Sequence, residues 1–125
     1  MKFRKDESGS VTIEFVMWLP LVMALVVLAV DAAVAFVNIG HMWQTSRETA
    51  RIVSRYGMTE AEAETWAAKN AVYGSMEPNV DVTVTGGSVQ VSMATPMNEL
   101  VVFGTLGFAS DFNFTTRVRH AMEPL

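Results

Sequence analysis

The sequence predicts an α+β protein in which a long N-terminal transmembrane helix continues into a small extracytoplasmic head with a second helix and a three-stranded antiparallel sheet. Three observations lead to this prediction. The run from Phe15 to Ser46 contains one charged residue, Asp31, within a chain of 125 residues. A helix-capping signal follows this run. The last third of the chain then alternates apolar and polar residues, as strands do.

Composition excludes several classes of function. The chain has no cysteine, which excludes disulfides, thiolate zinc sites and a cysteine nucleophile. Its net charge of −4 and isoelectric point near 5.0 oppose a nucleic-acid-binding surface. The two histidines, His41 and His120, are far apart and lack carboxylates at metal-ligand spacing. We therefore expect no metal, no cofactor and no nucleic-acid partner. No set of catalytic residues is visible either, so we expect no enzymatic activity.

Residues 1–9 form a short charged leader, and the apolar run that follows opens with a glutamate. Gly9 precedes Glu14 by five residues, and Phe15 comes directly after the glutamate. A carboxylate at the start of a membrane helix is costly to bury in lipid, so its presence indicates a functional role. This spacing singles out Gly9, Glu14 and Phe15 as candidate functional residues.

Residues 10–40 are predicted to form a transmembrane helix. The apolar residues from Phe15 to Ile39 make a helix of ~37 Å at ~1.5 Å per residue, which exceeds the ~30 Å hydrocarbon core of a bilayer. Asp31 lies ~26 Å beyond Glu14, so we expect it near the far boundary or turned toward a partner helix. Pro20 stands one turn inside the run and is expected to kink the helix.

The basic residues of the leader give the helix its direction. Lys2, Arg4 and Lys5 closely precede the apolar run. The positive-inside rule then places the N-terminus in the cytoplasm. Residues 41–125 are accordingly expected outside it, as the head.

Two other interpretations of the apolar run remain open. A cleaved secretory signal is one, because Ala33-Val34-Ala35 is typical of a cleavage site. The acidic residues of the leader and the length of the run oppose it. A plain uncleaved signal anchor is the other, with Glu14 as an interfacial residue and Gly9-Ser10 as a loop.

The first helix of the head is predicted over residues 41–56, as a continuation of the membrane helix. Arginines recur every four residues along it, at Arg47, Arg51 and Arg55, which indicates a solvated helical face. Gly57 is expected to end the helix, since glycine is the usual residue at this point.

The second helix is predicted over about residues 60–73. Thr59 and Glu62 have the spacing of a capping box, in which each side chain bonds the other residue's backbone N–H. Trp66 is expected on its apolar face, and Gly74 is expected to close it.

Three strands are predicted after these helices, over residues 80–85, 88–94 and 111–120. Gly86-Gly87 joins the first two as the two-residue turn of a hairpin. Phe112 and Phe114 in the third strand are expected in the core. The glycine-broken apolar segment from Leu100 to Phe108 either packs on the sheet or forms a partner site.

The N-terminal motif resembles the prepilin signal of type IV pilins, and more closely the opening of the TadE/TadG-like pseudopilins of the tight-adherence (Tad, Flp-type) pilus system. The resemblance covers about residues 4–55. Asp31 is followed by Ala32-Ala33, where that family more often has Glu-Phe-Gly. The shared elements, in chain order, are Asp6-Glu7-Ser8-Gly9, Glu14-Phe15, Leu19-Pro20, Asp31 and Ser46-Arg47-Glu48-Thr49-Ala50-Arg51.

The resemblance implies cleavage between Gly9 and Ser10 by a membrane prepilin peptidase. Gly9, Ser10, Glu14 and Phe15 would then be recognition residues of the peptidase's substrate. Glycine before the cut has a physical reason, because it lets the backbone extend at the peptidase site. Cleavage would leave a free α-amino group on Ser10, with which Glu14 of a neighbouring subunit can pair inside an apolar bundle. Asp31 is a second candidate for such charge pairing.

The function implied is that of a minor pilin or pseudopilin, a structural or assembly-initiating subunit of a Tad-type pilus that serves adhesion and biofilm formation. Expected partners are the membrane, the prepilin peptidase, other pilins and pseudopilins, and the Tad inner-membrane assembly platform. The expected location is the bacterial inner membrane, with a periplasmic head, before incorporation into an extracellular pilus. The alternative is an uncleaved, single-pass accessory protein of an envelope secretion system.

Overall fold

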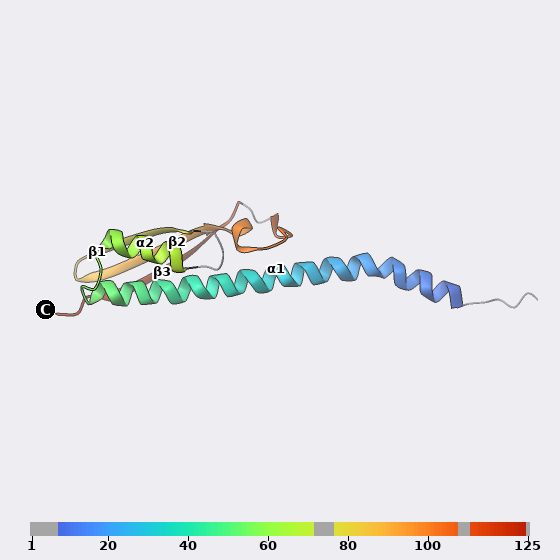
Figure 1. The fold of residues 1–125 in the computed structure, drawn as a ribbon, viewed down its shortest axis with the longest axis horizontal. Coiled ribbons are helices and arrows are strands. Elements are labelled where there is room, and N and C mark those ends of the chain that lie inside the picture. The colour runs from blue at the N-terminus through green and yellow to red at the C-terminus, as the bar shows by residue number, and fades with distance from the viewer. Residues whose placement is uncertain (1–7, 72–76, 108–110, 125) are drawn as a thin grey trace, which may run out of the picture.

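The computed structural model describes residues 8–71, 77–107 and 111–124, and it confirms the predicted α+β fold class (Figure 1). A long apolar helix carries a three-stranded antiparallel sheet and a short second helix along its C-terminal half. The elements, in chain order, are α1 (Ser8–Ser54), α2 (Glu60–Asn70), β1 (Asn79–Thr85), β2 (Ser88–Pro96), the 3₁₀ turn η1 (Met97–Leu100) and β3 (Asn113–Ala121).

Helix α1 runs without interruption from the predicted membrane segment into the first helix of the head, as the sequence predicts. It has 47 residues and is therefore ~70 Å long. Pro20 lies inside it and lacks the N–H that would bond the carbonyl of Val16, which weakens the helix at this turn. Figure 1 shows that the blue, N-terminal part of α1 bends away from the axis of the rest.

The two halves of α1 have different surroundings. From Val11 to Val30 the side chains are exposed, except for the half-buried Val27. From Asp31 to Ser54 one face of the helix is buried against the head. The head thus covers residues 31–40 as well, which the sequence assigns to the membrane segment.

The C-terminus of α1 closes on a tyrosine, where the sequence predicts a glycine. Tyr56 has the left-handed φ of 59°, and the N–H groups of Tyr56 and Gly57 donate to the carbonyls of Val53 and Ile52 at 2.9 and 3.0 Å. These are the two hydrogen bonds of a Schellman motif, with Tyr56 in the position that glycine usually takes. Gly57 is needed for another reason, because a Cβ there would lie 2.9 Å from Cγ2 of Ile52.

This contact gives a stability prediction for Gly57. We expect Gly57→Ala to lower the free energy of unfolding by about 1–2 kcal/mol, because the new methyl group overlaps Ile52. Gly40→Ala is the matched control. A Cβ at Gly40 meets nothing within 4 Å in mid-helix, so this substitution should stabilise by about 0.5–1 kcal/mol. Thermal unfolding of the full chain in detergent micelles, followed by circular dichroism, compares them. Equal stabilities would contradict the prediction.

Helix α2 begins with the predicted capping box. The N–H of Thr59 donates to Oε2 of Glu62 at 3.0 Å, and Oγ1 of Thr59 accepts from the N–H of Glu62. The Thr59 N–H and hydroxyl together hold the pKa of the Glu62 carboxyl below its usual range. The helix ends at Asn70, before the predicted Tyr73; Tyr73 and Gly74 lie outside the described residues.

Two further glutamates of α2 cover the edge of the sheet. Oε1 of Glu64 accepts the N–H of Val82 at 3.0 Å, and Oε1 of Glu60 accepts the N–H of Val84 at 2.9 Å. These N–H groups belong to β1, an edge strand whose free donors could otherwise pair with another chain. Helix α2 therefore fixes its own position on the head and blocks this edge.

The sheet has the order β1-β2-β3, with antiparallel neighbours. Gly86 and Gly87 form the predicted two-residue turn, both with positive φ, as a type I′ hairpin requires. Strand β3 begins at Asn113, after the predicted start. The prediction that Phe112 lies in the core is wrong: this side chain precedes the strand and is 69% exposed, whereas Phe114 packs against the core.

The core lies between the sheet and the two helices. Helices α1 and α2 present mainly small side chains to it, so their backbones approach the strands closely. Trp66 packs at its margin, half-buried, as expected for an apolar-face residue. The fully buried members of α1, α2 and the strands include Met42, Ala50, Ala63, Ala67, Val82, Val89, Val91 and Met93.

Candidate functional site

The predicted processing site lies at the start of α1. Gly9 is exposed, and a Cβ at this position would meet nothing within 4 Å. The Gly9–Ser10 bond is inside the first helical turn, since α1 begins at Ser8. The N–H groups of a first turn have no partners within the helix, so this turn unwinds at little cost. A peptidase could therefore reach the bond in an extended form.

Glu14 and Phe15 follow on the free half of α1. Phe15 is 68% exposed. Glu14 borders a shallow apolar groove along the helix with Met17, Trp18 and Leu21. Within the described residues, no hydrogen bond or ion pair reaches the Glu14 carboxylate. In a hydrocarbon environment such a carboxylate requires a positive partner from outside this part of the chain.

Asp31 has a different environment, because its carboxylate binds the backbone of a loop of the head. Oδ1 accepts the N–H groups of Val102 and Phe103 at 3.0 and 2.8 Å. Oδ2 accepts the N–H of Thr105 at 2.8 Å and the hydroxyl of the same residue. Gly104 has a φ of 72°, which allows the loop to turn its N–H groups toward one point. The side chain of Asp31 is fully buried by these contacts.

Further polar side chains of α1 join the same interface. Nδ2 of Asn38 donates to the carbonyl of Leu100 at 3.1 Å, and Oγ1 of Thr45 donates to the carbonyl of Asn70 at 3.1 Å. The hydroxyls of Ser46 and Thr116 share a buried hydrogen bond of 3.0 Å. Each of these three side chains of α1 thus meets a specific backbone or hydroxyl group of the head, which fixes the register of helix and head.

The row of polar side chains that α1 turns toward the head was not predicted from the sequence. Asp31, Asn38 and Thr45 are seven residues apart, so they lie on one face of a helix within an otherwise apolar run. That spacing was available as a signal for a face that packs against protein. The structure does not bring Asp31 and Glu14 together, because they are ~26 Å apart along α1. Charge pairing with another subunit remains a prediction for Glu14. The Asp31 carboxylate is instead fully buried against the head of its own chain, where both of its oxygens accept hydrogen bonds.

No cluster of three or more metal-ligating side chains occurs among residues 8–71, 77–107 and 111–124. The segment from Leu100 to Phe108 is packed at its start and exposed further on, and its role as a partner site stays a prediction. Leu100 is fully buried, whereas Val102 and Phe103 are 63% and 61% exposed. Phe108 lies outside the described residues.

These features define the class of the protein. Helix α1 is long and apolar enough to cross a membrane. Its N-terminal half is exposed and its C-terminal half packs against the head, so the chain has the build of an N-terminally anchored α+β protein. Residues 9–51 match the family model described as TadE-like protein. The predicted resemblance to TadE-like proteins is thereby confirmed over these residues, which make up about a third of the chain. Comparisons with curated proteins and with solved structures gave no match.

Proposed function

We propose that this protein is a minor pilin or pseudopilin, a structural or assembly-initiating subunit of a Tad-type pilus. It has no enzymatic role and serves adhesion and biofilm formation after cleavage behind Gly9 by a prepilin peptidase. The observation that carries the proposal is the TadE-like match, which begins at Gly9 and contains Glu14 and Phe15. These are the residues that a prepilin peptidase would recognise.

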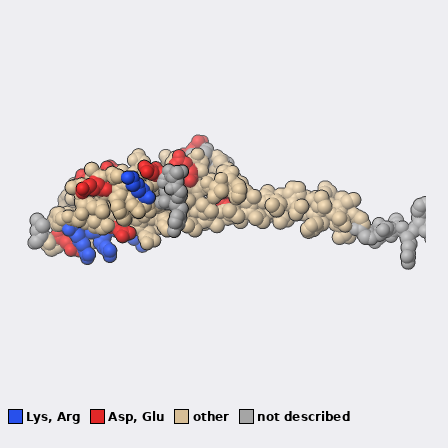
Figure 2. Space-filling model, viewed as in Figure 1, with Lys and Arg blue, Asp and Glu red and all other residues tan. Residues whose placement is uncertain are grey.

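The free half of α1 supports an assembly role. Its side chains between Val11 and Val30 are exposed apart from the half-buried Val27, and they are apolar apart from Thr12 and Glu14. On the face in Figure 2, charged side chains gather over the head, and none is visible on this half of α1. Such a surface is stable in lipid, and it also suits packing against the same surface of other subunits. The helix can therefore serve first as an inner-membrane anchor and then as part of a filament core.

The leader and the head fit opposite sides of the membrane. Lys2, Arg4 and Lys5 favour a cytoplasmic N-terminus by the positive-inside rule. The head is then periplasmic, and its edge strand β1 is already covered by α2. Proposed partners are the peptidase, other pilins and the Tad inner-membrane platform. Contacts to them would run along α1.

The size of the mature protein tests the proposed cleavage. In a host that has the Tad prepilin peptidase, the intact mass of the membrane-extracted protein should correspond to a chain that begins at Ser10. In a host without the peptidase, the chain should retain its leader. An intact leader in the first host would favour an uncleaved anchor, and a chain that starts at Phe36 would favour a secreted domain. Either result would contradict the proposal.

A variant at Gly9 separates recognition from folding. Gly9→Val should abolish the cut, because a branched side chain hinders the extended backbone at the peptidase site. The substitution should not disturb the fold, since Gly9 is exposed and nothing lies within 4 Å of a Cβ there. The variant should therefore retain the circular dichroism spectrum of the parent while it keeps its leader. Normal cleavage of this variant would contradict the assignment of Gly9.

A further inference from the structure

The loop that binds Asp31 limits how far the hydrocarbon of a membrane can extend along α1. Residues 101–107 are irregular apart from a terminal turn, and they lie at the level of Asp31 because three of their N–H groups bond its carboxylate. An irregular backbone that faces lipid does not occur within the hydrocarbon region, since its polar groups would lack partners. The hydrocarbon must therefore end at or before Asp31.

The length of the exposed stretch of α1 agrees with this boundary. The exposed part of α1 from Val11 to Val30 is ~30 Å long, which equals the hydrocarbon thickness of a typical bilayer. Phe36, which is 73% exposed on α1, then lies ~8 Å beyond Asp31, in the headgroup layer. Asp31 itself marks the outer interface. Arg47 is ~24 Å beyond Asp31 along the helix axis. In a helix perpendicular to the bilayer, Arg47 therefore lies out of reach of the lipid headgroups.

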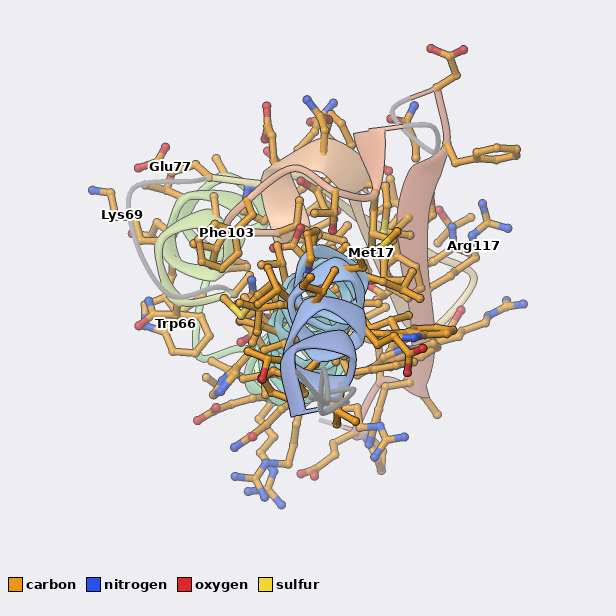
Figure 3. All side chains as sticks on the ribbon, turned by 90° about the vertical axis from the view of Figure 1, so that its right-hand side faces the viewer. Met17, Trp66, Lys69, Glu77, Phe103 and Arg117 are labelled. Carbon is orange, nitrogen blue, oxygen red and sulfur yellow. The ribbon has the colours of Figure 1, made fainter. Side chains whose placement is uncertain are left out.

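The loop presents an apolar surface at this boundary. Residues 100–108 carry no charged side chain. Val102 and Phe103 are 63% and 61% exposed, although the N–H groups of both residues are fixed to Asp31. Figure 3 views the molecule from the N-terminal side of α1, the side on which the membrane would lie, and there Phe103 is seen beside the helix.

We propose that the 101–107 loop is a membrane-contact site, which rests the head on the outer leaflet of the bilayer that α1 spans, with Val102 and Phe103 inserted at the level of the headgroups. The occupant of this apolar surface is lipid, because the loop is bonded to the helix at the depth where the lipid-exposed stretch ends. The surface is therefore continuous with the lipid-facing surface of α1. This inference rests on the membrane span in the proposed function, but it does not depend on cleavage after Gly9.

Single-cysteine labelling tests the depth of the loop, and the absence of native cysteine makes the labelling specific. The full chain carries the fluorophore NBD at Val102→Cys, and is reconstituted into phosphatidylcholine vesicles at a low protein-to-lipid ratio. Val84→Cys is the matched control, an exposed valine of β1 near the opposite end of the head. Leu28→Cys reports on the span itself. We expect blue-shifted emission and quenching by spin-labelled lipid at positions 28 and 102, and neither at 84.

Each other outcome overturns the proposal in a distinct way. An aqueous spectrum at 102 with a lipid spectrum at 28 would show that α1 spans the membrane but the loop does not touch it. An aqueous spectrum at 28 would contradict the span as well. A blue shift at 102 that develops only at high protein-to-lipid ratio would identify a second copy as the occupant.

A measurement without substitution guards against local disruption by the label. In nanodiscs that contain acyl-chain nitroxide lipid, the amide resonances of Val102 and Phe103 in the unsubstituted chain should be broadened. Those of Val82 and Val84 should remain sharp. Equal intensities in both groups would contradict the proposal.

Discussion

Replacing Asp31 with alanine is expected to release the 101–107 loop from α1. The Asp31 carboxylate accepts hydrogen bonds from three backbone N–H groups and one hydroxyl of the loop. Hydrogen bonds to a charged group are stronger than neutral ones, and loss of even one corresponds to about a tenfold change in a local opening equilibrium. Amide hydrogen exchange at Val102, Phe103 and Thr105 should therefore accelerate by about tenfold or more. The measurement uses the full chain in nanodiscs.

Two further variants identify which oxygen holds which part of the loop. Asp31→Asn keeps one acceptor oxygen and presents an NH₂ group to the other donors. It should therefore preserve part of the protection at Val102 and Phe103 and lose that at Thr105. Thr105→Val removes the hydroxyl alone and should have the smallest effect. Unchanged exchange in Asp31→Ala would show that the loop is held by its apolar packing at Leu100, and that the carboxylate does not anchor it.

Local signals in the sequence predict much of the head. The Gly86-Gly87 turn and the capping box of Thr59 and Glu62 depend on residues within a few positions of one another, so their side-chain types suffice. The strand alternation likewise gives the sheet. The end of α1 was harder to predict, because Tyr56 takes the left-handed conformation that the neighbouring Gly57 could adopt at lower cost.

The role of Asp31 as the anchor of the 101–107 loop could not be predicted, because its partners are distant in the sequence and are mostly backbone groups. They are mainly backbone N–H groups of Val102, Phe103 and Thr105, more than 70 positions away. Every residue except proline carries such a donor, so no residue type in the loop identifies it as the partner. The same holds for Phe112, whose exposure follows from the start of β3 at Asn113 and not from its own hydrophobicity. By contrast, Glu14 was identified by its position in an apolar run, which is a local property.

Glu14→Ala should leave cleavage largely intact but strongly reduce assembly into pili. The Glu14 carboxylate lies on the exposed, apolar half of α1 and has no partner within the described part of the chain, so its proposed partner is the α-amino group of Ser10 on a neighbouring subunit. Removing one member of a buried ion pair leaves the other charge uncompensated, which costs about 3–5 kcal/mol, or over a hundredfold in the contact. The ratio of sheared pilus protein to membrane-retained mature protein measures the loss.

Glu48→Ala is the matched control, because it removes an exposed glutamate from the same helix beyond the proposed membrane boundary. Its pilus yield should equal that of the parent. Glu14→Gln keeps the size and hydrogen-bonding capacity of the side chain without its charge, and should assemble as poorly as Glu14→Ala if charge pairing is what matters. Normal pili with either Glu14 variant would rule out amine pairing, while a retained leader would instead place Glu14 in recognition by the peptidase. Because intact mass and pilus yield are read from the same cells, cleavage and assembly are scored separately for each variant.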